Sequence, residues 1–188
     1  MLFRSTGYTQ VVSSANSYAA LKADGSISAW GNSIYGTADV PTGTGYTKIF
    51  STAGAFAALK TDGSVVTWGN TGFGNSNSPT GSGFIDIFTS SKSFSALAPD
   101  GSITSWGFSI TGGTGAPVFT GYTAITSNQQ AFAALKPDGT IYAWGSANFG
   151  SGFTTPIPLG SGFVKIYANG GAFTGVTADG SEIGRAHV

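Results

Sequence analysis

The sequence predicts an all-β protein, a β-propeller made of short antiparallel blades of 38 residues. Two observations support this prediction. The four tryptophans, Trp30, Trp68, Trp106 and Trp144, follow one another at steps of 38 residues. Asp-Gly pairs recur five times with steps of 38, 38, 38 and 41, and a glycine followed by an aromatic residue keeps the same steps. A fixed period of this size is typical of proteins in which one supersecondary unit is repeated and each copy packs on its neighbours.

Each unit contains three runs of residues that we expect to form strands. In the second unit these are a β-branched and aromatic run at 46–50, an apolar run at 55–60 and a run at 64–69, with Asp62-Gly63 between the last two. Asp-Gly between two apolar runs predicts a hairpin, because both residues tolerate the positive φ of such turns. The sequence thus predicts one three-stranded antiparallel sheet per unit. The Gly-, Asn-, Ser- and Pro-rich tail that follows leaves a fourth short strand as an open alternative.

The third run of each unit supplies apolar side chains to both faces of its sheet. Ile27, Val65, Ile103 and Ile141 lie three residues before the four tryptophans. Since side chains alternate between the faces of a strand, the two groups are expected on opposite faces. Both faces can then pack against neighbouring units, so we interpret the tryptophans as the structural core of the repeat rather than as binding platforms.

The repeated pattern Ala-Leu-Lys-x-Asp-Gly-(Ser/Thr)-(Ile/Val)-x-x-Trp-Gly resembles the repeat of the regulator of chromosome condensation family. The short units, with Trp30-Gly31-Asn32 leading through Gly36 to Val40-Pro41, resemble most the compact blades of the secreted bacterial β-lactamase inhibitory proteins. The resemblance covers residues 7–181 and recurs about four and a half times. It implies a ring of about seven blades, of which this chain would be a fragment with unpaired edges.

The repeat also defines the domain boundaries that we expect. The units span residues 7–44, 45–82, 83–120, 121–161 and, in part, 162–181, after a lead-in over 1–6 that is a candidate for truncation. Glu182 and Arg185 stand where the other units carry Ile or Val and Trp, and a charge at a core position is costly to bury. Residues 182–188 moreover resemble a translated sequencing adapter, so we expect this tail to be non-native.

Composition argues against several classes of function. Lysine and arginine number eight, aspartate and glutamate also eight, and charged residues make up 9% of the chain. This balance offers no basic patch for nucleic acid. There is no cysteine for thiol chemistry or disulfides, and no apolar run long enough to span a membrane.

The sequence gives no support to catalysis, a cofactor or a metal site. Its one histidine lies in the tail, so the abundant serines have no base to activate them. The Asp-Gly aspartates each stand alone, unlike the several oxygens of a calcium loop, and are interpreted as turn formers. We therefore predict that the protein is not an enzyme.

Candidate binding residues come from two loop positions that share one end of the units. The break between the first and second runs varies between units and contributes Asn16, Lys92, Gln129 and Gln130. Aromatic residues after Trp-Gly contribute Tyr35, Phe73 and Phe149, with Phe153 in the longer fourth unit. Grouped aromatics are typical anchors of protein interfaces. The competing interpretation is that these rings cap the edges of the blades.

The predicted function is a non-catalytic binding or display module for protein–protein interaction, part of a larger, exported bacterial protein at the cell surface or outside the cell. The alternative is a carbohydrate-binding or adhesive propeller that recognises a surface glycan with the same aromatics. Regulation of a small GTPase, which the name-giving family implies, is disfavoured because the repeat contains no long insertion.

Overall fold

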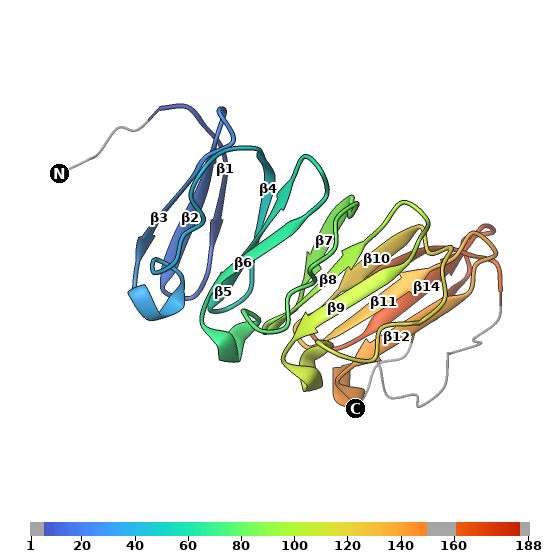
Figure 1. Ribbon diagram of the computed structural model, residues 1–188. Helices are drawn as coiled ribbons and strands as arrows, with labels where there is room; N and C mark the ends of the chain where they lie inside the picture. The colour runs from blue at the N-terminus through green and yellow to red at the C-terminus, as the bar shows by residue number, and fades with distance from the viewer. Residues whose placement is uncertain (1–5, 150–160, 185–188) are drawn as a thin grey trace.

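The computed structural model describes residues 6–149 and 161–184, which form five three-stranded antiparallel sheets standing side by side in chain order (Figure 1). Within each sheet the strands follow sequence order, so the second strand is central. The sheets consist of β1 (Tyr8–Ser13), β2 (Ser17–Lys22) and β3 (Ile27–Gly31); β4 (Tyr46–Ser51), β5 (Ala55–Lys60) and β6 (Val65–Gly69); β7 (Asp86–Thr89), β8 (Ser93–Leu97) and β9 (Ile103–Gly107); β10 (Ala124–Ser127), β11 (Ala131–Leu135) and β12 (Ile141–Gly145); and β13 (Phe163–Ala168), β14 (Phe173–Thr177) and β15 (Glu182–Gly184).

The predicted three strands per unit and the Asp-Gly hairpins are confirmed. A fourth strand is not found in the described tails; a 3₁₀ turn follows the third strand instead. These turns are η1 (Ser33–Tyr35), η2 (Thr71–Phe73), η3 (Ser109–Thr111) and η4 (Ala147–Phe149). In the first two units the side chain of Asn32 or Asn70 accepts the N–H two residues further on, which caps the turn.

The core lies between consecutive sheets rather than within one. The face of a sheet that carries the Leu of its second strand and the Ile or Val of its third packs on the next sheet's Phe and Trp. Leu59 and Val65 thus share a cluster with Phe94 and Trp106 of the following unit. Each Phe–Trp pair is stacked, with ring centroids 5.3–5.4 Å apart in the second, third and fourth sheets. The predicted opposition of aliphatic and Trp faces is therefore the basis of the row.

Trp30 differs from the other three tryptophans, and the prediction of a core position is wrong for it. Trp68, Trp106 and Trp144 are at most 3% exposed, but Trp30 is 45% exposed. It stacks on Tyr18 as its siblings stack on phenylalanine, with centroids 5.6 Å apart. The difference is one of neighbours, because no sheet precedes the first one in the described part of the chain.

Main-chain hydrogen bonds join neighbouring units at one end of the sheets. At the end with the Asp-Gly turns, the turn of one unit accepts hydrogen bonds from the Gly-aromatic pair of the next. Gly83 donates its N–H to the Asp62 carbonyl at 3.0 Å, and Phe84 donates to Gly63 at 3.1 Å. Gly63 has a φ of +77°, and a Cβ there would lie 2.5 Å from the Gly83 nitrogen. Glycine is thus required both by the turn and by the close approach of the next unit.

We expect the free energy of unfolding to fall by about 3–5 kcal/mol in Trp68→Ala, because the removed ring fills a closed interface. Trp30→Ala should cost about 1–2 kcal/mol, because its ring is already half in water. Urea unfolding followed by circular dichroism measures both. Equal losses for the two variants would contradict this account of the interface.

The indole N–H groups predict a second difference. Trp68 donates to the buried Gly36 carbonyl at 2.9 Å, whereas Trp106 Nε1 has no partner among the described residues. Trp144 donates its indole N–H to the hydroxyl of Ser105 in the preceding unit. Thr67 is the equivalent residue for Trp106, but its hydroxyl donates to Asn75 and does not accept from the indole.

Trp68→Phe should therefore cost about 1–2 kcal/mol more than Trp106→Phe, since only the former strands a buried carbonyl. The same unfolding measurement tests this difference. A larger loss for Trp106→Phe would show that its N–H is satisfied in solution.

Candidate functional site

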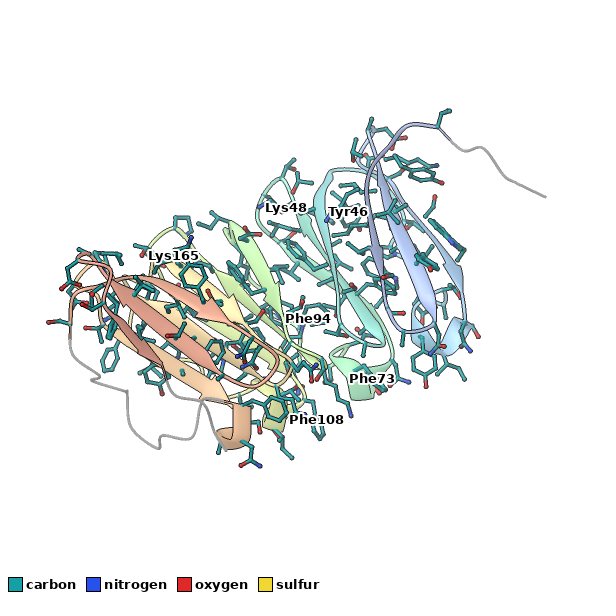
Figure 2. The ribbon with its side chains drawn as sticks, turned by 180° about the vertical axis from the view of Figure 1, so that it is seen from behind. Tyr46, Lys48, Phe73, Phe94, Phe108 and Lys165 are labelled. Carbon is teal, nitrogen blue, oxygen red and sulfur yellow. The ribbon has the colours of Figure 1, made fainter. Side chains whose placement is uncertain are left out.

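The loops between first and second strands and the four 3₁₀ turns lie at one end of the sheets, which we call the helix end. The Asp-Gly turns lie at the opposite end, the turn end (Figure 1). Figure 2 shows Phe73 and Phe108 at the helix end, and Tyr46, Lys48 and Lys165 toward the turn end. All described candidate residues from the sequence belong to the helix end, so their shared location follows directly from the strand order.

A chain of main-chain hydrogen bonds joins the loops of the helix end across the units. Ala15 donates its N–H to the Ala53 carbonyl, Ala53 to Ser91, and Ser91 to Gln129, at 2.8–3.0 Å. We call this series the loop belt. It uses main-chain atoms only, so these bonds do not themselves require particular side chains.

A polar residue at the start of each loop positions the adjacent 3₁₀ turn. In all four units its side chain donates to the carbonyl that ends the turn. In the first, second and fourth units it also accepts the N–H three residues on. The side chain of Asn128 accepts from Ala131 at 2.9 Å and donates to the Phe149 carbonyl at 2.7 Å. The equivalent donors in the earlier units are Ser14, Thr52 and Ser90, which bond to Tyr35, Phe73 and Thr111. The backbone of each predicted aromatic position is therefore fixed by its own unit.

The aromatic rings of the first and second units meet over a glycine. Tyr35 and Phe73 are half-buried and lie edge to face, with centroids 5.8 Å apart. Gly54, in the loop beneath, has no Cβ, and one placed there would lie 2.8–2.9 Å from both rings. The two rings thus form one shared ridge. Each ring is partly buried, as the edge-capping interpretation expects, and partly exposed, as the binding interpretation expects.

Lys92 extends this ridge into the third unit. Its Nζ lies 4.9 Å from the ring centroid of Phe73 and 5.3 Å from that of Phe108, a cation–π arrangement on both sides. The main chain is held as well, because the Lys92 carbonyl accepts the Phe108 N–H at 3.0 Å. We call Tyr35, Phe73, Lys92 and Phe108 the helix-end patch.

Phe108 is not among the residues predicted from the sequence. It stands at the position of the capping residues Asn32 and Asn70, and its side chain makes no cap. The available signal was a phenylalanine at the position where the first two units carry asparagine. In the structure its side chain is 41% exposed. The exposed Ile110 in the turn that follows adds apolar surface at the same end.

The remaining candidates lie along the helix end in their own units. Asn16 and Gln129 are exposed, and Gln130 and Phe149 are half-buried. The carbonyl of Gln129 ends the loop belt, and that of Gln130 accepts from Ser146 at 2.8 Å. Phe153 lies outside the described residues.

The turn end carries aspartates whose carboxylates are occupied by their own turns. Oδ1 of Asp62 accepts the N–H of Ser64 at 2.8 Å and its hydroxyl at 2.7 Å, and these two bonds lower the pKa of Asp62. The same geometry and direction recur at Asp24. In the described residues no group of three or more His, Cys, Asp or Glu side chains is placed to hold a metal ion. The aspartates act as turn residues there.

Comparisons with solved structures establish the fold. The ectodomain of the receptor kinase CR4 of Physcomitrella patens matches with a TM-score of 0.66 and 19% identity over 95% of this chain and 53% of that one. Prp20p of Saccharomyces cerevisiae, the yeast RCC1, matches with 0.62 and 15% over 94% and 57%. Human WBSCR16 matches with 0.60 and 15% over 93% and 60%. The neighbours are β-propellers, which confirms the predicted fold class.

The likeness extends to the fold and no further. The chain spans about half the length of the CR4 ectodomain that it matches. No family model and no curated protein matches the sequence. The resemblance to the regulator of chromosome condensation repeat therefore stays a prediction at the level of family. In the described part of the chain, no helix has the length and apolar character needed to cross a bilayer.

The last Asp-Gly turn provides a test of how these carboxylates are held. Hydrogen bonds from the Thr177 hydroxyl and the Ser181 N–H lower the pKa of Asp179 to about 2. Because the pKa in the folded state is depressed, the stability that this contributes is present above pH 3.8, the ordinary pKa of an aspartate, and is lost as the pH falls toward about 2. Carboxyl NMR titration should show the pKa of Asp179 rising in Thr177→Val, while that of Asp24 does not change. An unshifted Asp179 would contradict the assignment.

Proposed function

We propose that this chain is a non-catalytic binding module that contacts a protein partner through the helix-end patch. The observation that carries the proposal is the continuity of Tyr35, Phe73, Lys92 and Phe108 across three units. Aromatic residues are enriched at the centres of protein interfaces, where a few side chains supply most of the binding energy.

The rigidity of the surroundings supports the same proposal. The loop belt holds the loops, and the Thr52 hydroxyl bonds to the carbonyl of Phe73. Side chains that are already in place lose less conformational freedom when a partner binds, which favours affinity. A fixed surface of partly exposed rings is suited to the side chains of another protein.

One observation favours carbohydrate binding as a second candidate. The Trp30 ring, stacked on Tyr18, is 45% exposed and offers a flat aromatic surface of the kind that sugars bind. The same column is covered by a neighbouring sheet in three later units, which explains the pair without a sugar. We therefore rank this candidate second.

Regulation of a small GTPase has less support than protein or carbohydrate binding. Prp20p binds Gsp1p and histones, but this chain is only 15% identical to it. The steps of 38 to 41 residues between units leave no long insertion to contact a nucleotide site. We therefore rank regulation of a small GTPase third.

The proposed function predicts that partner capture depends on the helix-end patch. Proteins retained by the wild-type chain from an extract of its source should bind at least about tenfold more weakly to Phe73→Ala, the loss expected for an interface anchor. Phe119→Ala is the matched control, because Phe119 is 67% exposed and lies beside Lys136, near the turn end. Circular dichroism confirms that both variants fold.

Three outcomes would contradict the proposal or reorder the candidates. Equal losses in Phe73→Ala and Phe119→Ala would remove the helix end as the binding surface. Retention of no protein by the wild-type chain would also count against it. Binding to a glycan array that is abolished by Trp30→Ala would instead favour the carbohydrate candidate.

A further inference from the structure

The charge of Lys92 is isolated at the helix end. Among the loops between first and second strands and the 3₁₀ turns that the structure describes, it is the one charged side chain. Most other described charges flank the Asp-Gly turns, where Lys and Asp alternate, as in Lys60 and Asp62. The remainder lie on first strands or, for Asp39, in the tail after η1. The helix end is therefore weakly positive at one defined point.

This ammonium group has no carboxylate partner in the described structure. The ion pair found there joins Lys48 and Asp86 at 3.1 Å, on neighbouring first strands. Lys92 is half-buried between the rings of Phe73 and Phe108, so it has given up part of its hydration without gaining a counter-ion. A cation in this condition binds an incoming anion more strongly than one fully in water does, because the local dielectric is lower.

We propose that the helix-end patch recognises an acidic segment of its protein partner, with Lys92 binding a carboxylate and the two phenylalanine rings packing against its apolar neighbours. This inference rests on the proposed function and specifies the chemistry of the partner. Charge complementarity selects the occupant, since a single monovalent cation between apolar flanks matches one Asp or Glu within an apolar stretch. A highly charged polyanion would instead require several cations on one surface.

The site is built before the partner arrives. The main chain on both sides of the Lys92 side chain is fixed, by the Phe108 N–H on the Lys92 carbonyl and by the Ser91 N–H on Gln129. The rings confine the remaining freedom of the side chain. A carboxylate therefore meets a positioned ammonium group and not a mobile surface lysine, whose ion pairs contribute little.

The test uses a displayed library of short random peptides, selected on the wild-type chain at low salt. We expect the selected peptides to be enriched in Asp and Glu beside apolar residues. Fluorescence anisotropy on a selected peptide should show binding about tenfold weaker for Lys92→Gln and lost for Lys92→Glu. Lys92→Arg should bind within about threefold of wild type, because arginine keeps both the charge and the cation–π contacts.

Lys136→Gln is the matched control. Its Nζ also lies between two rings, 5.0 Å from that of Tyr122 and 5.8 Å from that of Phe119, but toward the turn end. This variant should leave peptide binding unchanged. Binding to the wild-type chain should also weaken as salt is raised, and this dependence should be smaller in Lys92→Gln.

The outcomes separate the two proposals. Peptides whose binding falls in Phe73→Ala but not in Lys92→Gln would overturn the acidic inference and leave the proposed function standing. Selected peptides that lack Asp and Glu would have the same meaning. Peptides insensitive to Phe73→Ala, or a selection that gives no binders, would overturn both.

Discussion

The packing of one sheet's aliphatic face on the next sheet's Phe–Trp face is the constraint on which the rest of this structure depends. A single three-stranded sheet leaves both faces in water, so each unit gains its stability from its neighbours. Phe94 and Trp106 are buried because Leu59 and Val65 of the preceding unit cover them. Each unit must therefore present the same two faces, which accounts for the regular recurrence of the aliphatic and Phe–Trp positions.

The ends of the units then divide two tasks. The turn end is tightly determined, because Gly63 must adopt a positive φ and also leave room for Gly83. The helix end is determined mainly through main-chain atoms and one polar side chain per loop, such as Thr52. Its outward side chains lie outside the contacts between the sheets, so the residues of the helix-end patch contact one another and solvent rather than the core.

The sequence was sufficient for the strands, the Asp-Gly hairpins and the two apolar faces, because these depend on local periodicity and turn chemistry. It did not indicate the 3₁₀ turns, since a turn of three residues such as the one that Asn70 caps is too short to show a helical pattern of apolar residues. The burial of Tyr35 against Phe73 also escaped prediction, because it depends on Gly54 and on contact between units. Trp30 shows the same limit most clearly. It occupies the same position of the repeat as Trp68, and its exposure comes from the lack of a preceding sheet in the described part of the chain.

The loop belt has a consequence for how such a protein can change over time. Its bonds run from Ala15 to Ala53, Ser91 and Gln129 through peptide groups alone, and peptide groups are the same for nearly every amino acid. Substitution of outward-facing side chains in these loops can therefore change what the surface displays, as long as Gly54 and the polar residue that begins each loop are kept. At the helix end, single substitutions of outward-facing side chains can therefore change binding specificity while the row of sheets keeps its stability.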